Sequence, residues 1–228
     1  MIRLARSRDE AALRTSGPIT TLYLQKTEVY GQKGASELAD YFFVFGLMLF
    51  IIWVAFWLFW LVLAYKTRSP VKIRRFAWLP FLPLLFVIIW IVLAGVFPDL
   101  LSLRIVPKNE IIGVAGIAIT LAGLGFSIWA RLHLGTNWSG QPVIRVQHTL
   151  VRTGPYRFVR HPIYTGLLLA SAGTALVLGA VWAFLVLFLL LISLLAKLRV
   201  EEKVLAEEFG ESYIQYKKEV KALIPFLL

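Results

Sequence analysis

The chain has 228 residues, of which 59% are hydrophobic and only 16% are charged, and its mean hydropathy is +0.75. An ordinary soluble domain is about half apolar and about a quarter charged, so this composition excludes a disordered chain and a water-soluble Rossmann or barrel enzyme. The lack of cysteine excludes disulfides, thiolate metal sites and cysteine nucleophiles. In a membrane protein, a formal charge of +11 is typical of basic cytoplasmic loops and calls for no nucleic-acid partner. The sequence predicts a small integral membrane protein.

Residues 1–40 form a polar N-terminal arm, to which we assign no function. Three apolar segments follow, each near the length of about 20 residues that a helix needs to span a bilayer. They run from Tyr41 to Tyr65, from Phe76 to Phe97 and from Ile111 to about Leu132. The second carries two prolines, which a membrane bundle tolerates. We predict that residues 41–132 form three transmembrane helices.

The third apolar segment contains four glycines, Gly113, Gly116, Gly123 and Gly125. Small residues at such spacing let two helices approach closely in lipid. The contact is either intramolecular or between two copies of the chain. The sequence leaves both open, and we predict no oligomeric state.

The uncharged run 163–196 is too long for a single span. As one helix it would measure about 50 Å, against a hydrocarbon core of about 30 Å. Gly173 and Gly179 lie inside the run, so we predict two short helices folded as a hairpin. With the three preceding segments this gives five spans, and the predicted fold class is an all-α, polytopic membrane bundle.

Basic residues outside the spans predict the topology. The loop 66–75 and the segment 131–162 carry several Lys and Arg and no acid, whereas the loop 98–110 is balanced. The positive-inside rule then places both basic segments and the C-terminal tail in the cytoplasm, and the N-terminus outside. The tail has apolar residues at spacings of three and four, which predicts an amphipathic helix that breaks near Gly210.

Residues that can carry chemistry gather in two segments on the predicted cytoplasmic side. The first, 148–166, holds two histidines, three arginines and two tyrosines around a Gly-Pro turn. Pro162 suits the first position of a helix, which places Arg160 and His161 at a helix N-terminus, where anions are attracted. This predicts a site for a carboxylate or phosphate. The alternative is a basic loop whose arginines contact lipid headgroups.

The second segment, 197–202, follows the predicted hairpin and ends in two adjacent glutamates. Charges at the end of a membrane helix are usually only solvated, which is the simpler interpretation. Beside the arginines, Glu201 and Glu202 would instead accept hydrogen bonds from an ammonium or from ribose hydroxyls. The histidines lack a metal-ligand spacing, so we predict no metal, and no Gly-rich loop supports a Rossmann or Walker nucleotide site.

These two segments resemble motifs of the isoprenylcysteine carboxyl methyltransferase family. The first motif comprises His148-Thr149-Leu150-Val151, Gly154-Pro155-Tyr156 and Arg160-His161-Pro162-Ile163-Tyr164-Thr165-Gly166, and the second comprises Glu201-Glu202-Lys203-Val204-Leu205, Phe209-Gly210, Tyr213 and Tyr216-Lys217-Lys218. The match is dense over 137–225, so we expect 133–228 to form the catalytic region. The resemblance implies methyl transfer from S-adenosylmethionine, bound in a cytoplasmic pocket built from both motifs.

Carried over residue by residue, the resemblance implies a set of cofactor-binding residues. They are Gln141, His148, Thr149, Leu150, Val151, Tyr156, His161, Pro162, Ile163, Tyr164 and Glu201. In the family, an arginine four residues before the first glutamate is linked to the substrate. Here that position is Lys197, which keeps the charge but loses the bidentate fork that suits a carboxylate. The resemblance implies a prenylated cysteine as the acceptor, and the change to lysine leaves room for another lipid-borne group.

A carboxylate acceptor is ionised at neutral pH and needs no general base, so the protein has only to bind and orient the reactants. We expect Arg160, His161 and the helix N-terminus to hold the cofactor's carboxylate, and Glu201 to meet its ammonium or ribose. The predicted catalytic residues are Arg160, His161 and Lys197. The lipid acceptor would enter sideways between the spans.

Other functions stay open on the sequence. Related membrane folds methylate phospholipid amines or thiols, and others resemble sterol reductases that use NADPH. An amine or thiol must lose a proton, and no isolated carboxylate lies within the spans to take it. A reductase needs a phosphate site, which the basic loop would supply. A transporter or scaffold is disfavoured because the span interiors contain no ionisable residue.

Overall fold

The computed structural model describes residues 18–66, 71–74, 103–135, 143–145 and 150–224. The second predicted span, 76–97, lies outside these residues, and so do Gln141, His148 and Thr149 of the predicted site. The chain divides into two units, 1–44 and 45–228. Because the second predicted span is not described, the count of five spans stays a prediction.

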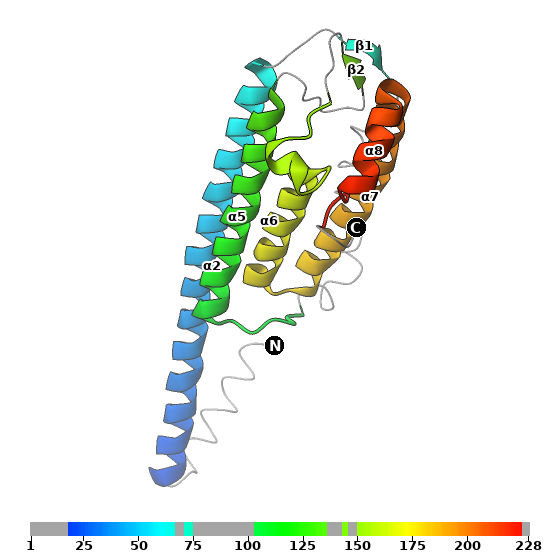
Figure 1. The fold of residues 1–228 in the computed structure, drawn as a ribbon. Coiled ribbons are helices and arrows are strands. Elements are labelled where there is room, and N and C mark those ends of the chain that lie inside the picture. Colours follow the sequence, from blue (N-terminus) through cyan, green and yellow to red (C-terminus); the bar gives the residue numbers. More distant parts are fainter. Residues whose placement is uncertain (1–17, 67–70, 75–102, 136–142, 146–149, 225–228) are drawn as a thin grey trace. The chain divides into compact units, whose positions relative to one another are not determined.

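The described residues form an almost entirely helical protein (Figure 1). Its elements are the helices α2 (Pro18–Lys66), α5 (Glu110–Leu134), α6 (Pro162–Leu178), α7 (Val181–Phe209) and α8 (Glu211–Glu219), the 3-10 helix η3 (Gly154–Arg157), and the strands β1 (Val71–Arg74) and β2 (Val143–Arg145). Three of the helices are long and apolar enough to cross a membrane. They are α5, α7 and the part of α2 from Phe43 to Leu63. The predicted class of polytopic helical membrane protein is confirmed.

The third predicted span corresponds to α5, and its ends are set by local signals. The side chain of Asn109 accepts a hydrogen bond from the backbone N–H of Ile111 at 2.8 Å, which caps the N-terminus of the helix. Glu110 in the first turn and Arg131 in the last turn complement the helix dipole.

Helices α5 and α6 pack against each other along their small residues. A Cβ atom on Gly116 would lie 2.8 Å from the carbonyl oxygen of Gly173, and one on Gly123 would collide with the backbone of Ala170. One turn further, Ser127 Oγ donates a hydrogen bond to the carbonyl of Ile163 at 3.0 Å. The sequence leaves two contacts open for these glycines, one within the chain and one between two copies. The structure shows the contact within the chain.

Replacing Gly123 by alanine is expected to destabilise the protein by about 1–3 kcal/mol, because the added methyl group must push α5 away from α6. The matched control is Gly125→Ala, since a Cβ at Gly125 meets open space. That change adds helix propensity and is expected to raise stability by up to about 1 kcal/mol. Thermal unfolding of both variants in one detergent, followed by circular dichroism, checks the prediction. Equal midpoints would contradict the close packing.

The predicted hairpin is present between α6 and α7. Gly179 ends α6 in a left-handed conformation with φ 64°. Glycine adopts this conformation readily because it has no Cβ atom to clash with the backbone. Arg104 Nη1 donates to the last carbonyl of α6, that of Leu178, at 2.5 Å. Figure 1 shows α5, α6 and α7 running alongside one another.

The second helix of the hairpin is longer than predicted. Instead of stopping with the uncharged run, α7 continues without a break from Val181 to Phe209. The reason is local, because Lys, Leu, Arg, Glu and Ala, all good helix formers, dominate 197–208, and neither glycine nor proline interrupts them. As a result, Lys197, Glu201 and Glu202 lie on a direct extension of a spanning helix.

The tail breaks at Gly210, as predicted, and α8 follows and ends at Glu219. Val220, which follows α8, has an extended backbone conformation. The strands β1 and β2 pair antiparallel, which joins the two basic segments that follow α2 and α5. The basic segments that the charge pattern assigns to one side of the membrane are therefore hydrogen-bonded neighbours.

Candidate functional site

The first group of site residues lies where the first turn of α6 meets α7. Tyr164 Oη donates a hydrogen bond to Glu201 Oε1 at 2.6 Å. Lys197 Nζ lies 3.9 Å from the same oxygen, and His161 Nδ1 lies 3.7 Å from Glu201 Oε2. The rings of His161 and Tyr164 are stacked at 5.5 Å, and Lys197 Nζ lies 5.3 Å from the centre of the tyrosine ring. We call these four residues the Glu201 cluster.

A second group, which we call the Glu202 cluster, surrounds the neighbouring glutamate. Arg160 donates to Glu202 Oε1 from Nε at 2.8 Å and from Nη2 at 2.5 Å. Lys217 Nζ of α8 lies 2.9 Å from Glu202 Oε2, and His161 Nε2 lies 3.6 Å from Oε1. The guanidinium of Arg160 also donates to the backbone carbonyl of Val220. This network joins the start of α6 to α7, α8 and the C-terminal residues.

The two clusters differ in burial. The side chains of Arg160 and Glu202 are only 8% and 10% exposed, whereas those of Glu201 and Lys197 are 18% and 26% exposed. A buried charge pair that satisfies itself is a structural element. A partly exposed carboxylate beside a partly exposed ammonium is able to meet a charged ligand. The Glu201 cluster is therefore the better candidate for ligand contact.

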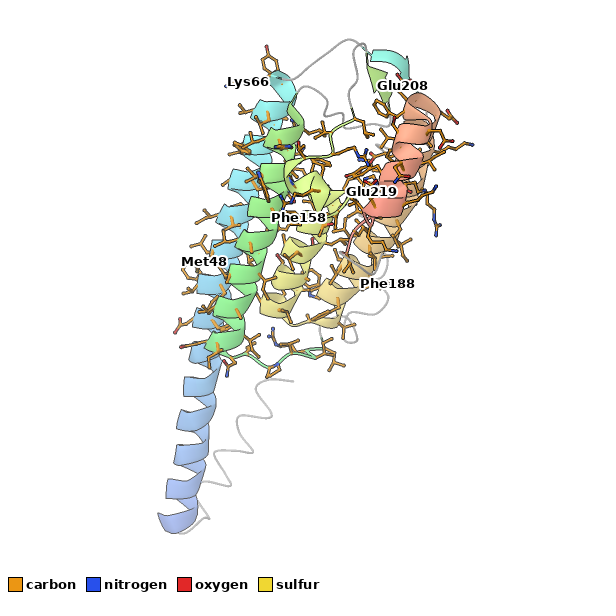
Figure 2. The ribbon with its side chains drawn as sticks, in the orientation of Figure 1. Met48, Lys66, Phe158, Phe188, Glu208 and Glu219 are labelled. Carbon is orange, nitrogen blue, oxygen red and sulfur yellow. The ribbon has the colours of Figure 1, made fainter. Side chains whose placement is uncertain are left out.

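Helix α8 contacts the loop before α6, and Figure 2 labels Glu219 of α8 and Phe158 of that loop. Tyr216 Oη donates to the backbone carbonyl of Tyr156 at 2.5 Å, and Tyr156 Oη donates to that of Ala130 at 3.4 Å. Burial raises the pKa of Tyr216 to about 12 against the opposing effect of Arg160 and Arg152, and burial also raises the pKa of Tyr156. Both hydroxyls stay protonated and donate. Of the two predicted positions for the tail, on the membrane or on the loop, the structure shows contact with the loop.

The other predicted site residues that the structure describes pack around the start of α6. Pro162 occupies the first position of α6, as predicted, and is buried. Ile163 and Tyr156 are buried in one apolar group with Tyr164 and Leu198, and Val151 packs against that group. Leu150 is half-buried in the segment that leads to η3.

The predicted anion site at the start of α6 has fewer open donors than expected. The backbone N–H of Arg160 donates to the carbonyl of Lys221 at 2.8 Å, and that of His161 donates to Ala222 at 3.0 Å. The side chain of Arg160 is engaged by Glu202. Sequence reasoning missed these partners and Lys217. The only signal for Lys217 was its place in the second motif.

Several known proteins are similar to this chain. Residues 111–212 match a family model described as phospholipid methyltransferase. Protein-S-isoprenylcysteine O-methyltransferase from Saccharomyces cerevisiae is 31% identical over 134 residues, which are 58% of this chain and 56% of that protein. The protein of the same name from Schizosaccharomyces pombe is 38% identical over 81 residues, 35% of this chain and 34% of that protein. The one from Xenopus laevis is 32% identical over 128 residues, 51% of this chain and 41% of that protein.

A solved structure of the eukaryotic intramembrane Ras methyltransferase, an isoprenylcysteine carboxyl methyltransferase, covers 68% of this chain and 55% of its own, with 24% identity and a TM-score of 0.45. The chain spans about half or less of the length of the curated relatives given above. The region that the family model matches holds the whole Glu201 cluster and, of the Glu202 cluster, Arg160, His161 and Glu202 but not Lys217. The resemblance that the two motifs predict is confirmed, and over part of its length the chain is similar to protein-S-isoprenylcysteine O-methyltransferases.

Proposed function

We propose that this membrane protein transfers the methyl group of S-adenosylmethionine to the carboxylate of a prenylated cysteine or of a similar lipid-borne acceptor. The observation that carries the proposal is the Glu201 cluster. In it, a partly exposed carboxylate and a partly exposed ammonium of α7 lie beside the two stacked rings of His161 and Tyr164. The similarity to protein-S-isoprenylcysteine O-methyltransferases supports it.

The residues present fit such a cofactor. Its amino-acid part carries one ammonium and one carboxylate, and the Glu201 cluster offers the carboxylate of Glu201 to the first and the imidazole of His161 to the second. His161 Nε2 is buried and makes no hydrogen bond within the described residues, so a donor or acceptor remains there. Glu201 would bind the cofactor's ammonium or ribose, as the sequence predicts. Arg160 would act by holding Glu202 and the start of α6.

The remaining cofactor contacts would come from the loop before α6. They are Gln141, His148, Thr149, Leu150, Val151, Tyr156, Pro162, Ile163 and Tyr164, in a catalytic region that we assign to 133–228. Bound there, the cofactor supplies an electrophilic methyl group on sulfur. The acceptor carboxylate is already ionised, so the chain's residues need only orient it and balance its charge, for which Lys197 is the candidate.

We place this site on the cytoplasmic side and the N-terminus outside. The support is the basic character of the segments that surround it, 66–75 and 131–162. The lipid part of the acceptor would reach the site from the bilayer, between the helices.

The test is a transfer assay with the protein in phospholipid vesicles and tritium-labelled S-adenosylmethionine. N-acetyl-S-farnesyl-cysteine is the acceptor, and its C-terminal carboxamide is the matched control. We expect label in the first compound only, as an ester that alkali releases as methanol. Folded protein that labels neither the acid nor a lipid would overturn the proposal.

A second acceptor class is favoured by one observation, the description of the matching family model as phospholipid methyltransferase. A phosphatidylethanolamine headgroup must lose a proton before its nitrogen attacks, and His161 between two carboxylates would be the group to take it. In the same assay, vesicles with and without phosphatidylethanolamine separate the two. Label in the lipid fraction alone would replace the first acceptor by the second.

A further inference from the structure

The residues that precede α6 are held by the C-terminal segment 220–224, which we call the strap. Its carbonyls at Lys221 and Ala222 accept the backbone N–H groups of Arg160 and His161 at 2.8 and 3.0 Å. The carbonyl of Val220 accepts from the Arg160 guanidinium. Three consecutive residues of the strap are thus bonded to two consecutive residues of the site.

One side chain ties the strap to α6 itself. Thr165 Oγ1, one turn after His161, donates to the carbonyl of Leu223 at 2.7 Å, and the carbonyl of His161 is a second, longer acceptor at 3.3 Å. The side chain of Leu223 is 3% exposed and lies in the apolar group that contains Tyr156 and Tyr164. The strap is therefore anchored at both ends, by Arg160 at Val220 and by Thr165 at Leu223.

The position of His161 depends on this anchoring. Its two ring nitrogens lie 3.7 and 3.6 Å from Glu201 and Glu202, so the ring fills the space between the two carboxylates. His161 lies just before the helix, where its backbone N–H has the strap carbonyl of Ala222 as its partner. If the strap shifts, His161 loses that bond and its ring leaves the space between the carboxylates.

We propose that Thr165 is a positioning residue of the candidate site, acting through the strap to hold His161 between Glu201 and Glu202. This inference rests on the proposed function, because it takes the His161–Glu201 pair as the place where the cofactor binds. Thr165 itself touches no ligand. Its hydroxyl, and not its methyl group or its volume, is the part that matters.

The experiment compares three variants of the full chain in detergent, with S-adenosylhomocysteine affinity measured by calorimetric titration. Thr165→Val keeps the shape and removes the hydroxyl, and is expected to weaken binding about tenfold, the effect of one lost hydrogen bond. Thr165→Ser restores the hydroxyl and is expected to bind within about twofold of the wild type. Thr174→Val is the matched control, because Thr174 lies in the same helix as Thr165 but away from the strap. Its Oγ1 accepts a hydrogen bond from Trp53 Nε1 at 3.0 Å.

Thr174→Val is expected to lower the thermal midpoint and to leave the affinity unchanged. Rescue by serine would assign the effect to the hydroxyl. Normal binding by a Thr174→Val variant with a lowered thermal midpoint would show that destabilisation alone does not weaken binding, and the two results together would support the positioning role. Equal affinity of Thr165→Val and the wild type would overturn the inference, and so would equal weakening by Thr165→Val and Thr174→Val. A folded wild type that does not bind S-adenosylhomocysteine would overturn the proposed function itself, which separates the two failures.

Discussion

Replacing His161 by alanine is expected to abolish saturable binding of S-adenosylhomocysteine. The ring stacks on Tyr164, and its two nitrogens face Glu201 and Glu202, so its loss removes the proposed ligand contact and the spacer between the two carboxylates. The milder change Tyr164→Phe removes only the hydroxyl that donates to Glu201 at 2.6 Å. It is expected to weaken binding roughly 10- to 100-fold, as for other hydrogen bonds to charged groups.

The matched control is His133→Ala. His133 is an exposed histidine at the end of α5, and its Nε2 lies 2.8 Å from Thr153 Oγ1. Because the side chain is at the surface and outside both clusters, its loss is expected to change affinity by no more than about twofold. Calorimetric titration of protein that elutes as a single folded species measures all three variants. Undiminished binding by His161→Ala would remove the Glu201 cluster as the cofactor site.

Replacing Glu202 by leucine is expected to lower the free energy of unfolding by about 3–5 kcal/mol, because it leaves the buried charge of Arg160 without its anion. The control is Glu219→Gln. Glu219 pairs with Arg152 at 2.6 Å, but the two side chains are 51% and 37% exposed. Loss of such a surface pair is expected to cost about 0–1 kcal/mol. Thermal unfolding in detergent compares the two variants.

A double variant makes the Glu202 prediction sharper. Arg160→Met combined with Glu202→Leu replaces the buried pair by apolar side chains and is expected to recover most of the stability lost by Glu202→Leu. S-adenosylhomocysteine binding is expected to stay impaired, because Arg160 no longer holds the start of α6. If Glu202→Leu and Glu219→Gln unfold at the same temperature, the Glu202 cluster has no special role in stability.

Much of the fold follows from local signals in the sequence. The bounds of α5 and the turn at Gly179 are set by hydropathy, a cap and a glycine within a few residues of each point. The break at Gly210 is of the same kind. The extension of α7 past the uncharged run was missed because the end of a hydrophobic run marks the edge of the membrane and not the end of a helix.

The site divides in the same way. The pairing of Lys197 with Glu201 spans one helical turn and is readable from spacing. The partner of Arg160 is 42 residues away in the chain, and Thr165 reaches a carbonyl 58 residues away, which no spacing predicts. Adjacent residues of a helix point about 100° apart, so Glu201 and Glu202 face different neighbours. Only the packing of α6 and α8 on α7 decides which of them is buried.

The measurement that tests the account most directly is calorimetric titration of the detergent-purified wild-type chain with S-adenosylhomocysteine and, separately, with NADPH. We expect saturable binding of S-adenosylhomocysteine and none of NADPH, because the Glu201 cluster offers a carboxylate and an imidazole to the ammonium and the carboxylate of an amino-acid group. Binding of NADPH alone would assign the chain to reductase chemistry and contradict the proposed cofactor. Folded protein that binds neither compound would contradict the enzymatic account as a whole.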